Sequence, residues 1–171
     1  MTDQTPPPHF LSQSDFATVI RSTPLVSIDF VIERPDGAVL LGQRHNEPAR
    51  GSWFVPGGRI RKTERLDDAF QRLLAAETGL DLPRSSAAPM GVYEHFYDTN
   101  ALGEAAFGTH YVVIAYRLEV AHDVAVIADA QHTAFRWQLP ADLLSDPDVH
   151  ANTKAYFEIN KDSGTLSPIA L

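Results

Sequence analysis

The most regular hydrophobic pattern of the chain lies between residues 66 and 80, in the sequence LDDAFQRLLAAETGL. Its apolar positions recur three and four residues apart, the spacing of one helix face, at Leu66, Ala69, Phe70, Leu73 and Leu74. Glu77 follows Leu66 by eleven residues, so at about 100° per residue it lies about 20° from the apolar face. A carboxylate at the buried edge of a helix is costly unless it is paired, hydrogen-bonded or bound to a metal. The pattern therefore predicts a helix that ends at Gly79, and it makes Glu77 the first candidate functional residue.

Alternating and β-branched apolar positions predict strands in the rest of the chain. These strands are expected over residues 25–33, 38–44, 53–58, 89–98, 109–120 and 131–138, with the first two joined as a hairpin. Shorter helices are expected over residues 13–21 and about 148–161, the second beginning after Asp146 and Pro147. Helices at the start, middle and end of a run of strands predict an α/β sandwich, with a mixed sheet between helices.

The composition favours a single domain. The chain has 171 residues, of which 44% are hydrophobic, enough for one core. Residues 1–9 are polar and proline-rich, so we expect a flexible tail before a domain of residues 10–171. The formal net charge of −8 argues against general binding to nucleic acid or to an acidic membrane. The sequence has no cysteine, no long apolar run and no signal-peptide pattern, so a cytoplasmic protein without disulfides is expected.

The predicted helix and the loop before it carry a spaced motif. Seven residues fit the spacing of the Nudix box: Gly58, Glu64, Arg72, Leu74, Glu77, Gly79 and Leu80. In this respect the chain is similar to the Nudix hydrolases. Two positions depart from the motif, because Leu73 and Ala76 stand where that family usually has glutamates. The loss of two carboxylates weakens the attraction for several hard cations and removes a usual candidate for the general base.

The altered box and its surroundings resemble one branch of that family, the GDP-mannose mannosyl hydrolases. The resemblance covers about residues 10–160 and is carried by DFATVIRSTPLVSIDF, WFVPGGR, HFYD, THYVV, QH and VHANTKAYF. It implies a Nudix-type αβα sandwich, one Mg²⁺ ion per subunit with Mn²⁺ as an alternative, and a homodimer. It also implies hydrolysis of GDP-mannose, or of GDP-glucose, by cleavage of the sugar C–O bond with inversion at the anomeric carbon.

The resemblance implies three oxygen ligands for the metal: Glu77, the Gly57 carbonyl and the Gln131 side chain. Mg²⁺ prefers about six oxygens, and substrate phosphates and waters often complete its shell. Each candidate also has a structural interpretation. Glu77 can be an ion-pair partner at the surface edge, Gly57 part of an ordinary turn, and Gln131 a solvated strand residue.

A nucleotide sugar also needs cationic and hydrogen-bonding partners. Arg44 and Arg59 lie at loop edges near the glycines. The resemblance implies that they bind the diphosphate and assist its departure, since arginine contacts phosphate through two parallel hydrogen bonds. The alternative interpretation is that both are ordinary solvated side chains. The resemblance assigns Asp29 a place near the sugar, although its position on an alternating strand also allows a solvated charge. Tyr111 is either a ligand of the sugar or phosphate or an ordinary half-buried strand residue.

Two further roles follow from the resemblance. Phe10, Leu11 and Phe16 are expected to help hold the nucleotide base, while the alternative interpretation is a first helix that simply packs on the core. Arg72 stands eight residues after Glu64. Arginines at this position of the motif are typically partners that fix the loop and helix, so we expect Arg72 to have a structural role.

Without the usual glutamates, the general base must come from elsewhere in the chain. Histidine titrates near neutral pH, and the resemblance gives Gln131 and His132 the roles of metal ligand and base. Neighbouring residues of a regular strand point to opposite faces, so both can reach one site only through a loop or bulge at the strand start. His95, His110 and His150 are weaker alternatives for the base.

Two rival functions remain open at this point. A conventional Nudix pyrophosphatase would cleave a P–O bond in a nucleoside diphosphate derivative and release a mononucleotide. A regulator that binds sugar nucleotides through a decayed box would bind without turnover. The depleted box argues against the first, and the retention of Glu77, Gln131 and His132 together argues against the second.

Overall fold

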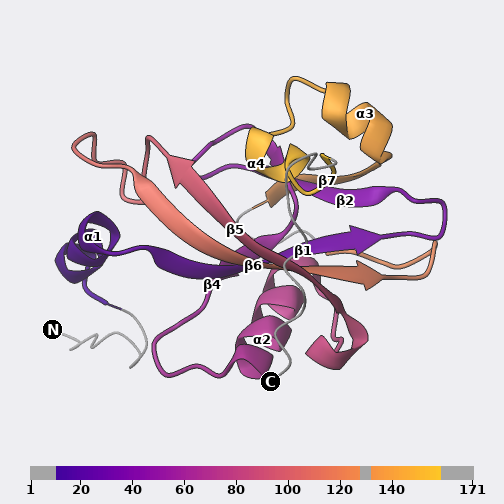
Figure 1. Ribbon diagram of the computed structural model, residues 1–171, viewed down its shortest axis with the longest axis horizontal. Helices are drawn as coiled ribbons and strands as arrows, with labels where there is room; N and C mark the ends of the chain where they lie inside the picture. The colour runs from indigo at the N-terminus through magenta and orange to yellow at the C-terminus, as the bar shows by residue number, and fades with distance from the viewer. Residues whose placement is uncertain (1–10, 128–131, 159–171) are drawn as a thin grey trace, which may run out of the picture.

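A twisted mixed sheet forms the centre of the molecule (Figure 1). The computed structural model describes residues 11–127 and 132–158. Its strands are β1 (Leu25–Glu33), β2 (Val39–Arg44), β3 (Trp53–Phe54), β4 (Gly57–Arg59), β5 (Ala88–Tyr97), β6 (Thr109–Glu119) and β7 (His132–Gln138). Its helices are α1 (Gln13–Ser22), α2 (Leu66–Thr78), α3 (Pro140–Ser145), α4 (Ala151–Lys154) and a 3₁₀ turn, η1 (Arg84–Ser86).

The sheet is mixed because one of its strand pairs is parallel and the others are antiparallel. The central path runs β3-β2-β1-β6-β5, with β4 added to β1 and β7 added to β2. β1 and β6 are parallel from Leu25 and Tyr111 to Glu33 and Glu119. β1 pairs with β2 beside their turn, at Glu33 and Val39. At residues 27–29, β1 pairs with β4 instead, so β1 and β2 diverge towards the start of β1.

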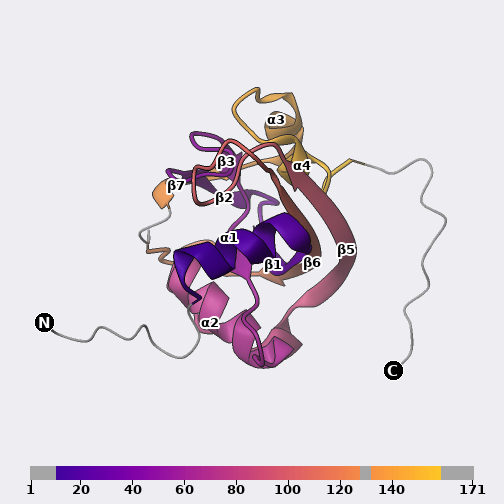
Figure 2. The same cartoon turned by 90° about the vertical axis from the view of Figure 1, so that its left-hand side faces the viewer.

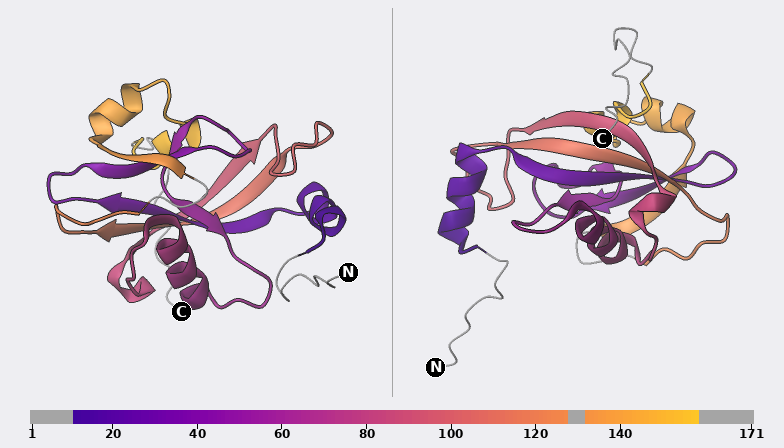
Figure 3. Two further views of the ribbon diagram at one scale, coloured as in Figure 1. Left: turned by 180° about the vertical axis from the view of Figure 1, so that it is seen from behind. Right: turned by 60° about the horizontal axis from the view of Figure 1, so that its bottom comes forward.

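Helices cover both faces of the sheet, as the αβα prediction requires (Figure 3). On one face α2 contributes Phe70, whose ring meets Phe30 of β1 edge-on at a centroid distance of 5.0 Å. On the other face Leu143 of α3 and Tyr156, which follows α4, pack with Val31 of β1. Phe30 and Val31 are adjacent and both fully buried, because the two faces of β1 serve two separate cores.

The helix predicted from the hydrophobic pattern is confirmed as α2. It ends with Gly79 in the left-handed conformation at φ 75°, which glycine adopts without steric cost. Helix α1 is also present, and it lies beside the ends of β1 and β6 (Figure 2). Ala17 and Ile20 are its buried residues. Among the described residues, no helix combines the length and the apolar character needed to cross a membrane.

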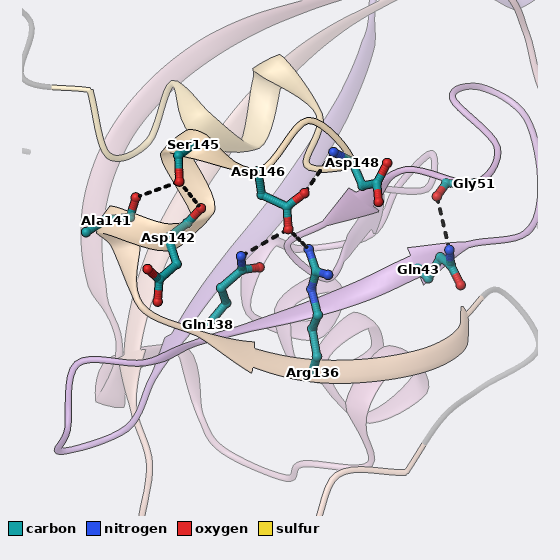
Figure 4. A network of polar contacts seen from close by, with 9 residues as sticks. All are labelled: Gln43, Gly51, Arg136, Gln138, Ala141, Asp142, Ser145, Asp146 and Asp148. Atoms are coloured by element: carbon teal, nitrogen blue, oxygen red, sulfur yellow. Dashed lines mark hydrogen bonds and ion pairs between the residues drawn. The ribbon is translucent and has the colours of Figure 1, made fainter.

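The expected last helix, about 148–161, is wrong in its start and length. The structure has one short turn of helix there, α4, which His150 caps by accepting a hydrogen bond from the Asn152 amide at Nδ1. Asp146 was expected to start this helix, but its carboxylate accepts hydrogen bonds from Arg136, Gln138 and the Asp148 amide (Figure 4). The bond from the Asp148 amide is one that a helix cap makes, but Val149 pairs with Trp53 of β3, so the helix does not begin until Ala151. The bonds from Arg136 and Gln138 join the α3–α4 connection to β7.

Candidate functional site

A pocket of about 740 Å³ opens where β1 and β2 diverge. Its walls come from strands β1 to β6, the C-terminal half of α2 and the loops after β2 and β5. Six residues singled out from the sequence line it together: Asp29, Arg44, Gly57, Arg59, Glu77 and Tyr111. They are up to 82 positions apart in the chain, so the fold gathers them into one place.

The loop before α2 is fixed by an ion pair inside the motif, which confirms the structural role of Arg72. Nη2 of Arg72 donates to Oε2 of Glu64 at 2.7 Å and to the Arg59 carbonyl at 3.1 Å. The Arg61 amide donates to the same Glu64 oxygen at 2.9 Å. The hydrogen bond from Arg72 is the main cause of the lowered pKa of Glu64. These contacts hold the end of β4 and the loop that follows it, which place Arg59 and Arg61 at the pocket.

The two glycines of β4 allow this strand to lie very close to β1 and to helix α2. A Cβ atom on Gly57 would lie 2.4 Å from Oδ1 of Asp29 and 2.6 Å from the Ile28 carbonyl oxygen. A Cβ atom on Gly58 would lie 2.6 Å from Cδ2 of Leu73 and 3.8 Å from Oε1 of Glu77. Gly57 therefore belongs to a strand held tightly against β1, and the ordinary-turn interpretation is wrong.

Glu77 is the carboxylate that α2 brings to the pocket. It is only 2% exposed, so it does not lie at the surface edge, where the structural interpretation placed it. Leu73 and Ala76 line the same wall, and their side chains carry no oxygen. Within residues 11–127 and 132–158, no three Asp, Glu, His or Cys side chains form a metal-binding cluster. A single carboxylate beside backbone carbonyls suits one hard cation that takes its other ligands from substrate and water.

Among the described residues, five arginines line the pocket and supply positive charge to it, and Arg44 and Arg59 are two of them. The guanidinium of Arg59 lies over the Phe16 ring at 4.2 Å, and that of Arg44 lies over the Phe54 ring at 5.4 Å. Stacking uses the face of a guanidinium, while its N–H groups lie in the plane and serve anions. Burial raises the pKa of Tyr111, and the charges of Arg44 and Arg59 partly offset this rise. Tyr111 is therefore a neutral hydroxyl at physiological pH, close to both arginines.

Asp29 belongs to a buried hydrogen-bond chain. The Tyr156 hydroxyl donates to Oδ2 of Asp29 at 2.7 Å, and its oxygen lies 3.3 Å from Nε2 of His95. Because Tyr156 has one proton and gives it to Asp29, Nε2 of His95 is the donor of the second bond. Burial raises the pKa of Asp29 to about 6 despite the opposing effects of Tyr156 and Arg44. Asp29 is thus half-buried and hydrogen-bonded rather than a solvated charge.

Three alternative bases have other roles in the structure. His95 donates from Nε2 to Tyr156, and burial lowers its pKa to about 4. His150 caps α4 and stacks on Phe54 at a centroid distance of 4.5 Å. His110 stacks on Phe96 at 4.3 Å and does not line the pocket.

The remaining sequence candidates are only partly described. Phe10 and Gln131 lie outside the described residues, as does the side chain of His132. The backbone of His132 begins β7 and pairs with Arg44, with a register shift between Gly42 and Arg44. This irregularity lies at the strand start, where the sequence argument required a bulge.

Of the residues expected to hold the nucleotide base, Phe16 and Leu11 do not line the pocket. Phe16 is stacked on Arg59, at the edge of the pocket. Leu11 is 49% exposed and does not line the pocket.

Comparisons with known proteins identify the family. Residues 23–158 match the model of the NUDIX domain. The chain belongs to the Nudix family. Low-salt glycan biosynthesis protein Agl8 of Haloferax volcanii is 40% identical over 126 residues, covering 74% of this chain and 78% of that protein. An ADP-ribose pyrophosphatase of Methanocaldococcus jannaschii is 37% identical over 70 residues, covering 41% of this chain and 40% of that protein.

Solved structures share this Nudix fold. The MutT NUDIX hydrolase from Burkholderia pseudomallei superposes with a TM-score of 0.65 at 27% identity, covering 80% of this chain and 97% of that one. The MutT protein from Methanosarcina mazei has a TM-score of 0.64 at 19% identity, covering 80% and 92%. Together with the family match, these structures identify the protein as a Nudix hydrolase with an αβα fold.

Sequence reasoning missed part of this Nudix pocket. The loop between β5 and β6 is held by the buried Asn100. It lines the pocket through Ala101, Leu102 and Gly103. Phe54, His95 and Tyr97 also line the pocket. The signal for the ordered loop was Asn100 itself, since an asparagine can bond to several backbone groups of its own turn.

Proposed function

We propose that this Nudix protein hydrolyses GDP-mannose, and also GDP-glucose, to GDP and the free hexose by cleavage at the anomeric carbon. The observation that supports the proposal is the part of α2 that lines the pocket. Glu77 is buried there beside Leu73 and Ala76. A pyrophosphatase that relies on several carboxylates of this helix for metals and base lacks two of them here, whereas cleavage at carbon can use one metal and a base from another element.

One Mg²⁺ ion, or Mn²⁺ in its place, would be held by Glu77, the Gly57 carbonyl and Gln131. When bound, it would neutralise charge that develops on the departing diphosphate. The donor set is made of oxygen atoms, which is the ligand type that these ions prefer.

The arginines of the pocket bind and stabilise the leaving group. Arg44 and Arg59 approach the diphosphate with in-plane N–H groups, and their attraction increases as charge passes to the phosphate oxygen. Asp29 and Tyr111 contact the sugar, Asp29 as an acceptor and Tyr111 as a hydroxyl that keeps its proton. The hexose is thereby held with its anomeric carbon exposed to water.

His132 accepts the proton of the attacking water. The water oxygen bonds to the anomeric carbon while the bond from that carbon to the phosphate oxygen breaks, and its electron pair leaves with GDP. Attack opposite the leaving group inverts the anomer, so an α-linked mannose is released as the β form. Support for this role comes from the backbone of His132, which pairs with Arg44, and from the other duties of His95 and His150.

The comparisons support a sugar-nucleotide substrate in one respect. The relative from Haloferax volcanii is named for glycan biosynthesis, and activated sugars are the building blocks of such a process. The relative named ADP-ribose pyrophosphatase matches less than half of this chain and represents the rival cleavage at phosphorus. We further propose that the protein acts as a homodimer in the cytoplasm.

Product analysis tests the proposal. The protein is incubated with GDP-mannose and Mg²⁺, and the nucleotide and sugar products are separated by anion-exchange chromatography. GDP with free mannose supports cleavage at carbon. GMP with mannose 1-phosphate would identify a pyrophosphatase, and tight binding without any product would identify a regulator.

A further inference from the structure

The loop between β5 and β6 is a preorganised wall of the pocket. Nδ2 of Asn100 donates to the carbonyls of Glu104 and Phe107, both at 2.7 Å. Its Oδ1 accepts from the amides of Leu102 and Glu104 at 3.0 and 3.3 Å. The hydroxyl of Thr109 adds a bond of 2.9 Å to the Thr99 carbonyl. A completely buried side chain that satisfies four backbone groups holds this wall in one conformation.

This wall is connected to the opposite loop of the pocket by one hydrogen bond. The Thr99 hydroxyl donates to Oε2 of Glu47 at 2.9 Å, across 52 positions of sequence. Glu47 is half-buried and lines the pocket, in the loop that follows Arg44. Among residues 11–127 and 132–158, Oε1 of Glu47 has no hydrogen-bond partner, and the carboxylate has no ion-pair partner. The pocket therefore contains an oriented carboxylate with one acceptor atom available to a ligand.

We propose that Glu47 recognises hydroxyl groups of the hexose, a role that rests on the proposed sugar-nucleotide activity. A carboxylate repels the diphosphate, which has negative charge and no hydrogen-bond donors at neutral pH. The hexose is neutral and rich in donors, and hydrogen bonds from hydroxyls to a charged acceptor are among the strong ones. Arg44, three residues before Glu47, pairs with the backbone of His132, so Glu47 is in the loop next to the proposed reaction centre.

Thr99 is a positioning residue in this arrangement. Its donated bond fixes the plane of the Glu47 carboxylate and occupies Oε2, which leaves Oε1 as the acceptor for the sugar. Asn100 holds the backbone on which Thr99 stands. Sugar selection would thus come from two loops joined across the pocket, while the diphosphate is bound by β2 and β4.

The test compares Glu47→Gln with Glu104→Gln, which changes an exposed carboxylate of the β5–β6 loop that does not line the pocket. For Glu47→Gln we expect kcat/KM with GDP-mannose to fall about 10- to 100-fold, since a charged acceptor is lost. Inhibition by the product GDP, which has no hexose, should not change. Glu104→Gln should match the wild-type protein in both measurements.

Singly deoxygenated GDP-mannose analogues identify the contact. One of them should be a poor substrate for the wild-type protein and suffer no further loss in Glu47→Gln, because the two changes remove the same bond. Thr99→Val should give a smaller loss, chiefly in KM, and that loss should also disappear with the same analogue.

Several results would overturn the inference. Equal weakening of GDP inhibition in Glu47→Gln would assign Glu47 to the nucleoside, and unchanged kcat/KM would remove it from recognition. A wild-type protein without turnover would refute the proposed function separately. The affinities of the wild-type protein and of Glu47→Gln for GDP-mannose and for GDP, measured by calorimetry, would then decide the inference. Weaker binding of GDP-mannose alone by Glu47→Gln supports it, and equal affinities of the two proteins for GDP-mannose contradict it.

Discussion

The charged carboxylate of Asp29 destabilises the folded protein, and this loss of unfolding free energy can be measured. Its carboxyl group is half-buried between β1, β4 and Tyr156, and burial raises its pKa from 3.8 to about 6. The folded protein therefore binds this proton more tightly than the unfolded chain does. Stability from Asp29 is fully present below pH 3.8 and is lost as the pH rises from there to about 6.

The size of the effect follows from the pKa difference. At about 1.4 kcal/mol per pKa unit, the shift corresponds to at most about 3 kcal/mol at neutral pH. Water reaches part of the side chain, so we expect about 1–3 kcal/mol. The substitution Asp29→Asn removes the charge, and its amide oxygen can still accept the bond from Tyr156. This variant should be more stable than the wild type at pH 7–8 and nearly equal to it at pH 4, while its activity falls.

Urea denaturation at a series of pH values between 4 and 8, with a chelator present, measures this difference. Asp146→Asn is the matched control, and its effect on the free energy of unfolding should have the opposite sign. Bonds from Gln138, the Asp148 amide and Arg136 lower the pKa of Asp146, so its loss should destabilise the protein at neutral pH and matter less in acid. A difference between Asp29→Asn and wild type that does not change with pH would refute the argument.

Four further substitutions test the site. Glu77→Gln should raise the Mg²⁺ concentration needed for half-maximal activity sharply, and an unchanged metal titration would remove Glu77 as a ligand. His132→Gln should lower kcat by roughly 10²–10⁴-fold with little change in GDP binding, and an unchanged rate would remove it as the base. Gly57→Ala should cost about 1–3 kcal/mol in urea denaturation, because its Cβ atom would meet backbone atoms of β1. Gly58→Ala should cost less, since Leu73 can move its side chain, and equal costs would contradict this comparison.

The elements that the sequence predicted well are those with a local cause. The face of α2 follows from its apolar spacing, and its end follows from Gly79. The motif places Glu64 and Arg72 eight residues apart, and the structure joins them directly. The α/β class follows from the alternation of strands and helices. These features depend on residues that are close to one another in the sequence.

The features that sequence reasoning missed depend on distant residues. Asp29, His95 and Tyr156 form one hydrogen-bond chain, although 127 positions of sequence separate Asp29 from Tyr156. The predicted hairpin of β1 and β2 is paired beside its turn, but β4 takes the place of β2 further along β1, and this exchange opens the pocket. Neither periodicity nor composition contains this information, because it arises from the twist and pairing of the complete sheet.

The central claim is cleavage at carbon rather than at phosphorus, and the position of an oxygen label tests it most directly. GDP-mannose is hydrolysed with Mg²⁺ in ¹⁸O-labelled water, and the products are weighed by mass spectrometry. We predict the label in mannose and none in GDP. Label in a phosphate product would contradict the account and assign the protein to the pyrophosphatases.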